Sequence, residues 1–436
     1  MQRSTVSLSS DFEAFPHFAL LRQHCQGKGG YLVGGAVRDA LLGHKLTDLD
    51  LIFPQDPTPL AKAFARKIGG HWFWLDSSRQ QSRVVISRQT DALHFDFLPF
   101  RASTLQADLL DRDFSINAMA LALDGDLTTG SLHDPCDGRT DLQQQRLAMV
   151  SERSFADDPL RIIKGIRHAT ILDLEVDDAT SNAMRQHAPA LKTTAPERVR
   201  QEIWRILADD RVGRGLELLR NCGVGRVLFG EPYERADLDQ IASRVSRWRQ
   251  QWRWLQSQHN VVADWLNPEL EQGLNVETLL IFTYALALLD PALPLVLAQS
   301  WRLSRKSSRA IKSLLALDAA ALEEFLAIAP TDRACSWWAN RKGLEPTLLI
   351  PALAVIAAQS GAATLEPLAD WAPLLADAEV APKSLVDGHW MRSELGLSGE
   401  EIAESMQRLA DAEIRGEVGD VEQAKAFLLG RCSRSV

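Results

Sequence analysis

The stretch "YLVGGAVRDALLGHKLTDLDLIF", residues 31–53, decides the fold of the first part of the chain. Two adjacent glycines lead into "AVRDALLG", which has the pattern of a helix, and the stretch ends in the alternating run "TDLDLIF". Residues two apart on a strand point to the same side, so Asp48 and Asp50 would present both carboxylates on one face. The stretch therefore predicts a helix followed by a strand that carries an acidic pair.

These residues form the outline of a phosphoryl-transfer site. Two carboxylates on one rigid element suit Mg²⁺, which binds through one or two carboxylates and substrate phosphates. Gly34 and Gly35 let backbone amides approach an anion, and the positive end of the following helix, with Arg38 in its first turn, would face a phosphate. A lone Asp-x-Asp occurs often by chance, but one that follows an anion cradle predicts metal-assisted transfer.

A third carboxylate would complete a site for two metal ions. Asp96 lies in the strand-like run "LHFDFLPF" and is the best candidate, because neighbouring strands of one sheet can bring their acids together. An aspartate buried in a strand without a partner or a metal is costly.

Length and composition bound the class of protein. With 436 residues and 46% hydrophobic content, the chain has room for about three or four domains. No apolar run is long enough to span a bilayer and no secretory signal opens the chain, so we expect a cytoplasmic protein. Five scattered cysteines without a CxxC pair fit neither a disulfide framework nor a zinc cluster.

The pattern along the chain predicts an α+β protein. Residues 30–125 mix short strand-like runs with helical stretches, whereas almost everything from Ser151 onward has helical spacing. We expect an α/β head with a small mixed sheet over 1–125, then an all-helical neck over 126–210, body over 211–325 and tail over 326–436.

The net charge of −9 argues against a large nucleic-acid surface, but two stretches are strongly basic. In "SRVSRWRQQWRW", residues 243–254, a buried structural role for Trp248, Trp252 and Trp254 is favoured over base stacking. In the second, "WRLSRKSSRAIK", five cations would share one arc of a helix: Arg302, Arg305, Lys306, Arg309 and Lys312. Such a face suits a phosphate backbone, although a solvated basic face is the common alternative.

Five motifs in order resemble those of the class II nucleotidyltransferases, which comprise bacterial tRNA nucleotidyltransferases and bacterial poly(A) polymerases. They are "GGAVRDALLG" with "DLD", "DRDFSINAMAL", "DPCDGRTDL", "FADDPLRIIKGIRHA" and "ERVRQEIWRIL". The resemblance implies a polymerase β-like head. It also implies roles for single residues. Asp48 and Asp50 would be metal ligands and Asp96 the third catalytic carboxylate, while Gly35, Arg38 and Arg112 would bind the triphosphate and Asp113 the ribose. Asp158 and Arg161 would read the base of the nucleotide, which Lys164 and Arg167 would also contact.

The fourth motif also makes chemical sense as a base reader. We expect Asp157, Arg161, Lys164 and His168 on one helical face, with Asp158 and Arg167 at its edges. Cytosine and adenine both offer an amino donor beside a ring-nitrogen acceptor, so a carboxylate and a guanidinium can select CTP and ATP without a template. A solvent-facing ion pair is the common alternative for such spacing.

The chain departs from the family pattern at four positions. Asp111 replaces an arginine near the phosphates, and Lys164 replaces an arginine and loses its bidentate geometry. Cys136 and Asp137 replace a Phe-Gly pair, where aspartate tolerates the left-handed turn that glycine would adopt. No carboxylate is lost, so we expect an active enzyme.

The product depends on the segment 102–111, which joins Arg101 to Arg112. It is short, as in CC-adding members, whereas full CCA-adding members carry a longer flexible loop there. The short segment favours addition of two cytidines to tRNA, after which a separate A-adding enzyme would act as a possible partner. The basic stretch 302–312 is the expected tRNA contact. Complete CCA addition is the alternative; poly(A) synthesis is disfavoured by the acidic end of the chain, and a catalytically silent RNA-binding protein by the retained carboxylates.

Overall fold

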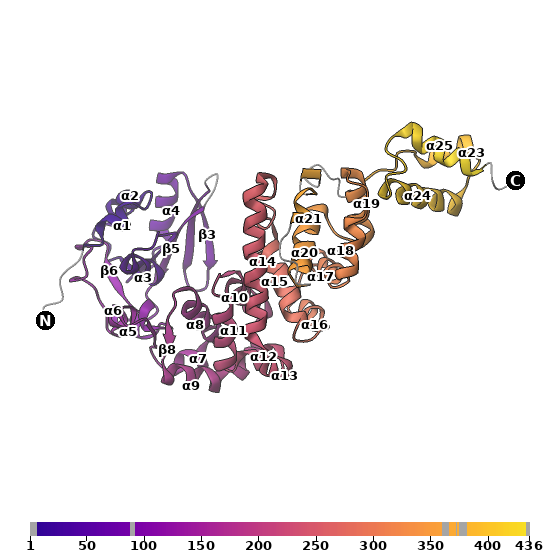
Figure 1. Cartoon of the computed structure of the whole chain (residues 1–436). Coiled ribbons are helices and arrows are strands. Elements are labelled where there is room, and N and C mark those ends of the chain that lie inside the picture. Colours follow the sequence, from indigo (N-terminus) through magenta and orange to yellow (C-terminus); the bar gives the residue numbers. More distant parts are fainter. Residues whose placement is uncertain (1–6, 88–91, 360–365, 372, 375–381, 433–436) are drawn as a thin grey trace. The chain divides into compact units, whose positions relative to one another are not determined.

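The computed structural model describes residues 7–87, 92–359, 366–371, 373–374 and 382–432 (Figure 1). Contacts divide the chain into two compact units, one of residues 1–194 with 218–228 and the other of residues 195–217 with 229–436. The predicted α+β class is confirmed, since the first unit holds a mixed sheet and the second is almost entirely helical. The bounds of the four domains given above stay predictions.

The sheet of the first unit has six strands in the order β3-β4-β5-β2-β1-β6. Their bounds are β1 Tyr31–Val33, β2 Asp48–Phe53, β3 His71–Asp76, β4 Gln81–Ser87, β5 Ala92–Pro99 and β6 Ala120–Ala122. The pair of β2 and β5 is parallel and all other pairs are antiparallel. β3 is therefore one edge of the sheet, and β2 and β5 lie at its centre.

An aromatic core covers one face of this sheet. Phe53 of β2 and Phe97 of β5 stack with ring centroids 5.9 Å apart, and both Phe95 and Phe97 contact Phe64 of α4 (Thr58–Ile68). Because side chains alternate along a strand, packing this face leaves Asp50 and Asp96 on the other. The hydrophobic pattern thus positions the acidic residues.

The remaining helices of the first unit follow in chain order. They are α1 Ser9–Glu13, α2 Phe18–Cys25, α3 Gly35–Leu42, α5 Leu105–Leu110, α6 Gly138–Gln143, α7 Arg153–Asp157, α8 Leu160–Ile171 and α9 Asp178–His187, with a small parallel pair of β7 (Arg146–Leu147) and β8 (Glu175–Val176). Helix α8 packs closely on the second motif: a Cβ added to Gly165 would lie 2.4 Å from the ring of Phe114. Motifs two and four are thereby joined within one unit.

The second unit is built from helices. It contains α10 Pro196–Ala208, α13 Glu231–Arg235, α14 Leu238–Gln258, α15 Val276–Ala287, α16 Leu293–Ser300, α17 Arg305–Leu315, α18 Ala319–Leu326, α19 Asp332–Lys342, α20 Pro346–Gln359, α21 Glu366–Ala369, α23 Gly388–Leu395, α24 Gly399–Ile414 and α25 Val421–Cys432. A short hairpin, β9 Glu269–Glu271 with β10 Leu274–Asn275, precedes α15, and α11 Val212–Asn221 and α12 Val224–Phe229 contribute to both units.

Two of the three tryptophans in the first basic stretch are core residues. Trp248 and Trp252 are each 2% exposed, so the predicted structural role is confirmed for them. Trp254 is only partly buried. None of the described helices is both long and apolar enough to cross a membrane.

Candidate active site

Three carboxylates come together on the open face of the sheet. In the parallel pair, Asp50 of β2 lies opposite Asp96 of β5, and Asp48 lies opposite His94. Nδ1 of His94 is 2.9 Å from a carboxylate oxygen of Asp48. The predicted convergence of Asp96 with the acidic pair is therefore confirmed as geometry.

The electrostatics of this cluster favour a cation. Burial, followed by the negative charge of Asp96, raises the pKa of Asp50 from 3.8 to about 6, and Asp48 adds to the rise while Arg112 opposes it. The described residues contain no group of three or more His, Cys, Asp or Glu side chains arranged to hold a metal. The Asp48 and Asp50 oxygens fit a divalent ion that takes its other ligands from a triphosphate and water.

Arg83 of β4 is a member of this site that the sequence reasoning missed. Its Nε and Nη2 donate to the two oxygens of Asp96 at 2.6 and 2.8 Å. The alternation in "SRVVISR" could have revealed it, because Arg83 lies opposite Asp96 once β4 and β5 are paired. The pairing register, however, follows only from the fold.

Gly34 leaves space for two charged side chains. It has φ 66° and ψ −133°, and an added Cβ would lie 3.1 Å from an oxygen of Asp50 and 3.4 Å from a nitrogen of Arg112. Arg112 is 8% exposed and donates to Asp108 of α5 at 3.1 Å. Burial, followed by the positive charge of Arg101, lowers the pKa of Arg112, while Asp108 and Asp50 oppose this fall. This is an arrangement that a polyanion would relieve.

Hydrogen bonds link Arg38 to Asp113 through Asn117, next to Gly35. Arg38 is 9% exposed and donates to both oxygens of Asp39, at 2.8 and 3.0 Å, and to Asn117 at 2.8 Å. Asn117 in turn donates to Asp113 at 3.1 Å. Asp39 and Asn117 therefore fix the guanidinium of Arg38 beside Gly35, whose added Cβ would lie 3.4 Å from it.

The third motif is a structural support for the second. The carboxylate of Asp134 accepts from the backbone N–H groups of Gly138 and Arg139 at 2.7 and 2.9 Å, while Ser115 donates to Asp141 at 2.5 Å. Asp137 has φ 57°, so the predicted left-handed turn at this departure is confirmed.

The fourth motif differs from the single helix that we expected. Helix α7 ends at Asp157, Asp158 is extended with φ −144° and ψ 96°, and α8 begins at Leu160. The expectation that Asp157 shares a helical face with Arg161 is therefore wrong. The cause is Pro159, because a residue that precedes proline is driven out of the helical region.

The cations of the fourth motif do lie on α8. Arg161 donates to Ser154 of α7 at 2.7 Å, and Lys164 follows one turn later, partly exposed. Arg167 lies 3.3 Å from Nε2 of His168. The carboxylate of Asp158 accepts from the backbone N–H of Leu160 at 3.2 Å, which fixes it at the start of the helix.

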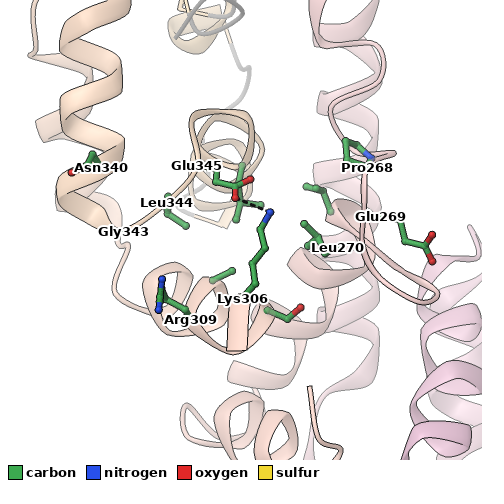
Figure 2. Close-up of a pocket in the computed structure, with 13 residues that line it drawn as sticks. Pro268, Glu269, Leu270, Lys306, Arg309, Asn340, Gly343, Leu344 and Glu345 are labelled. Carbon is green, nitrogen blue, oxygen red and sulfur yellow. Dashed lines mark ion pairs between the residues drawn. The ribbon is translucent and has the colours of Figure 1, made fainter. Parts of the chain in front are cut away.

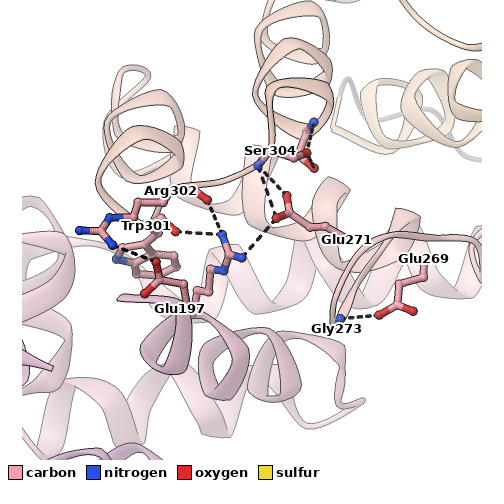
Figure 3. Close-up of polar contacts among 9 residues, drawn as sticks. Glu197, Glu269, Glu271, Gly273, Trp301, Arg302 and Ser304 are labelled. Atoms are coloured by element: carbon pink, nitrogen blue, oxygen red, sulfur yellow. Dashed lines mark hydrogen bonds and ion pairs between the residues drawn. The ribbon is translucent and has the colours of Figure 1, made fainter. Parts of the chain in front are cut away.

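The second basic stretch is divided rather than continuous. Helix α17 begins at Arg305, whereas Arg302 precedes it with φ 54° and bonds to Glu197 of α10 at 3.2 Å (Figure 3). Lys306 pairs with Glu345 at 2.7 Å, beside a cavity of about 470 Å³ that Arg309 also lines (Figure 2). The expectation of five cations on one helical arc is wrong for Arg302, because the turn at Arg302 to Ser304 comes before the helix.

Three cations of this stretch share a face of α17. Arg305, Arg309 and Lys312 follow at intervals of four and three residues, and all three are exposed. They are the part of the predicted RNA contact that the helix keeps together.

Residues 30–148 match the model described as "Poly A polymerase head domain", and residues 173–234 match "Probable RNA and SrmB- binding site of polymerase A". A CC-adding tRNA nucleotidyltransferase of Geobacter sulfurreducens is 38% identical over 50% of this chain and 50% of its own. An A-adding tRNA nucleotidyltransferase of Deinococcus radiodurans is 31% identical over 92% of this chain and 95% of its own. The solved structure "The complex structure of CCA-adding enzyme with CTP" is similar in fold, with a TM-score of 0.68 at 20% identity over 100% of both chains.

Proposed function

The chain belongs to the tRNA nucleotidyltransferase family, and from this premise we propose that it transfers CMP from CTP to the 3′-hydroxyl of tRNA without a template, one nucleotide per step with release of pyrophosphate, twice in succession. The observation that carries nucleotidyl transfer is the row of Asp50 and Asp96 beside the cradle of Gly34 and Arg112. A cytoplasmic location is part of the proposal, since tRNA and CTP are its proposed substrates.

Each residue group has one task in this proposal. Asp48 and Asp50 would hold divalent ions, which we take to be Mg²⁺; such ions neutralise charge on the reacting phosphate. Arg112 and Arg101, together with the backbone at Gly34 and Gly35, would bind the triphosphate. Arg38, fixed by Asp39 and Asn117, would support that cradle.

Base selection is assigned to the start of α8. The carboxylate of Asp158 would accept from the amino group of cytosine, and the guanidinium of Arg161 would donate to its ring nitrogen. Asp113 would contact the ribose. Lys164 and Arg167 would add positive charge around the nucleotide. Ser154 holds Arg161 in place, which supports a fixed reading geometry.

The segment 102–111 supports addition of cytidine only. It forms the short helix α5, which Thr104 caps and whose Leu109 and Asp108 are 1% and 0% exposed. Asp108 also accepts from the backbone of Arg101 at 2.7 Å, so both ends of the segment are pinned. A segment held in this way has few alternative conformations with which to reshape the site for ATP. A separate A-adding enzyme would then complete the tRNA.

Incorporation at single-nucleotide resolution tests the proposal. The substrate is tRNA that ends at the discriminator base, supplied with CTP alone, ATP alone or both, in Mg²⁺. We expect two cytidines and no adenosine, even with both nucleotides present. A completed CCA would support the full CCA-adding alternative, and a long adenosine tract from ATP alone would support poly(A) synthesis.

Replacement of the acidic pair separates an enzyme from a silent RNA-binding protein. In the double variant Asp48→Ala/Asp50→Ala we expect incorporation to be lost while tRNA binding is preserved. If wild-type protein binds tRNA but incorporates nothing under any of these conditions, the enzymatic proposal is wrong.

The face of α17 that carries Arg305, Arg309 and Lys312 is assigned to the tRNA backbone. Reversal of Arg305 and Arg309 to glutamate should weaken tRNA binding and flatten its dependence on salt. Unchanged affinity and salt dependence would remove this face from the interface. We expect Arg302 and Lys306 to contribute less to tRNA binding than Arg305 and Arg309, because each is already paired with a glutamate.

A further inference from the structure

The open face of the sheet continues past the carboxylates to the edge strand. Cross-strand partners share a face, and the pairing aligns Asp50, Asp96, Arg83 and Phe73 in one row across β2, β5, β4 and β3. Adjacent strands lie about 4.8 Å apart, so Phe73 is about 10 Å from Asp96 along this row. A single nucleotide can bridge that separation.

Phe73 is an exposed aromatic side chain that packing of the sheet does not require. It is 44% exposed. Its neighbours Trp72 and Trp74 point to the opposite face, where they contact each other at 5.0 Å and Lys62 of α4 lies 4.3 Å from the Trp72 ring. Among the described residues, Phe73 has no such ring partner. Its flat face is thus available on the same side as the acidic cluster.

An in-line reaction would bring the second substrate over Phe73 if the leaving group departs over the cradle. In nucleotidyl transfer the attacking and leaving oxygens lie roughly in line on opposite sides of the phosphate. The cradle of Gly34 and Arg112 lies on one side of Asp50 in the sheet, and Asp96 lies on the other. If pyrophosphate leaves over the cradle, the attacking 3′-hydroxyl approaches over Asp96, with its nucleotide above β4 and β3.

We propose that Phe73 stacks on the base of the 3′-terminal nucleotide of the RNA primer and that Arg83 faces that nucleotide's phosphate. This inference rests on the proposed function and specifies where its second substrate binds. Stacking on an aromatic ring is tolerant of base identity, as a primer end that changes after each addition requires. Arg83 uses Nε and Nη2 to hold Asp96, which leaves Nη1 for a phosphate. Arg83 is thus a positioning residue for both Asp96 and the primer.

The first test measures stacking without chemistry. A tRNA acceptor hairpin with 2-aminopurine as its 3′-terminal base is titrated with full-length protein in the absence of nucleotide, and fluorescence quenching reports stacking. We expect wild type and Phe73→Trp to quench. For Phe73→Leu we expect the quenching to be lost and the Kd to rise about tenfold.

Trp74→Leu is the matched control. Trp74 is the next residue of the same strand and is 39% exposed, but it lies on the other face. This variant should bind and quench as wild type does. Thermal unfolding of both leucine variants separates a local effect from loss of the fold, and Phe73→Trp keeps the test informative if Phe73→Leu unfolds.

Three results of the quenching assay would overturn the inference: no quenching by wild type, quenching by Phe73→Leu equal to that of wild type, or equal losses in Phe73→Leu and Trp74→Leu. Concentration-dependent self-association that Phe73→Leu abolishes, without any change in primer binding, would assign the edge to a second copy of the chain. These outcomes are independent of the proposed function, whose failure is seen as absent incorporation by wild type. If wild type adds cytidine and the KM for primer is the same in Phe73→Leu, only the stacking assignment fails.

Discussion

Asp50 of β2 and Asp96 of β5 lie opposite each other in a parallel strand pair, and burial together with this facing charge raises the pKa of Asp50 to about 6. The two acids belong to segments 46 residues apart in the sequence. Their approach is maintained in the folded chain at an electrostatic cost, which a divalent ion bound between Asp50 and substrate would offset.

Asp50→Asn should change how stability depends on pH. The folded-state pKa of Asp50 lies above the unfolded value, so the folded state binds more protons between about pH 4 and pH 6. Its contribution to the free energy of unfolding therefore falls as pH rises through that window. Well above pH 6 we expect Asp50→Asn to be more stable than wild type by about 3 kcal/mol, and below about pH 4 the difference should vanish. Urea unfolding of both proteins in a chelator measures this, and a pH-independent difference would contradict it.

Gly34→Ala should damage the nucleotide cradle more than the fold. The new Cβ would meet Asp50 and Arg112, in a backbone conformation that residues other than glycine rarely adopt. Gly43→Ala is the control, because Gly43 has φ 69° but nothing within 4 Å of an added Cβ. We expect both variants to lose about 1 to 2 kcal/mol of stability. Only Gly34→Ala should lose more than tenfold in kcat/KM for CTP; equal losses in both variants would refute the role of the cradle.

Asp158→Ala should weaken discrimination between nucleotides. If Asp158 accepts from the cytosine amino group, its removal should reduce the ratio of kcat/KM for CTP over UTP about tenfold or more. Asp157→Ala is the matched control, since Asp157 ends α7 and pairs with Arg153 at 3.9 Å. Steady-state incorporation of each nucleotide gives the ratio. The same loss in both variants would show that the effect is one of general charge.

Gly138→Ala should destabilise the first unit by about 3 kcal/mol. An added Cβ would lie 2.1 Å from the carbonyl oxygen of Ser115, so the second and third motifs would have to separate. Asp137→Gly, at the adjacent left-handed position, should instead stabilise the protein by about 0.5 kcal/mol. Chemical denaturation of the two variants is the measurement, and a neutral Gly138→Ala would mean that the backbone moves apart without strain.

Local pattern was sufficient for several features. The spacing of Asp48 and Asp50 predicted a strand with both carboxylates on one face, and the substitution of Asp137 for glycine predicted a left-handed residue. The α+β class followed from the change of periodicity along the chain. Each of these depends on interactions between residues close in sequence, and for that reason the sequence determines them.

Proline and turn geometry limited the local predictions at two places. Pro159 separates Asp157 and Asp158 from α8, and the turn that holds Arg302 separates it from α17. A prediction from residue spacing alone continues the helix through such positions, because spacing carries no information about where the backbone must leave the helical region.

The tertiary structure alone decided which distant residues meet. Arg83 lies on Asp96, and Phe73 lies beside Arg83, because β3, β4 and β5 pair in one particular register; a shift by one residue would turn all of these side chains to the other face. The sequence by itself determined the residue types, the elements and the acidic pair. The order and register of the strands, set by burial of the aromatic core on the opposite face, decided that these residues form one continuous row.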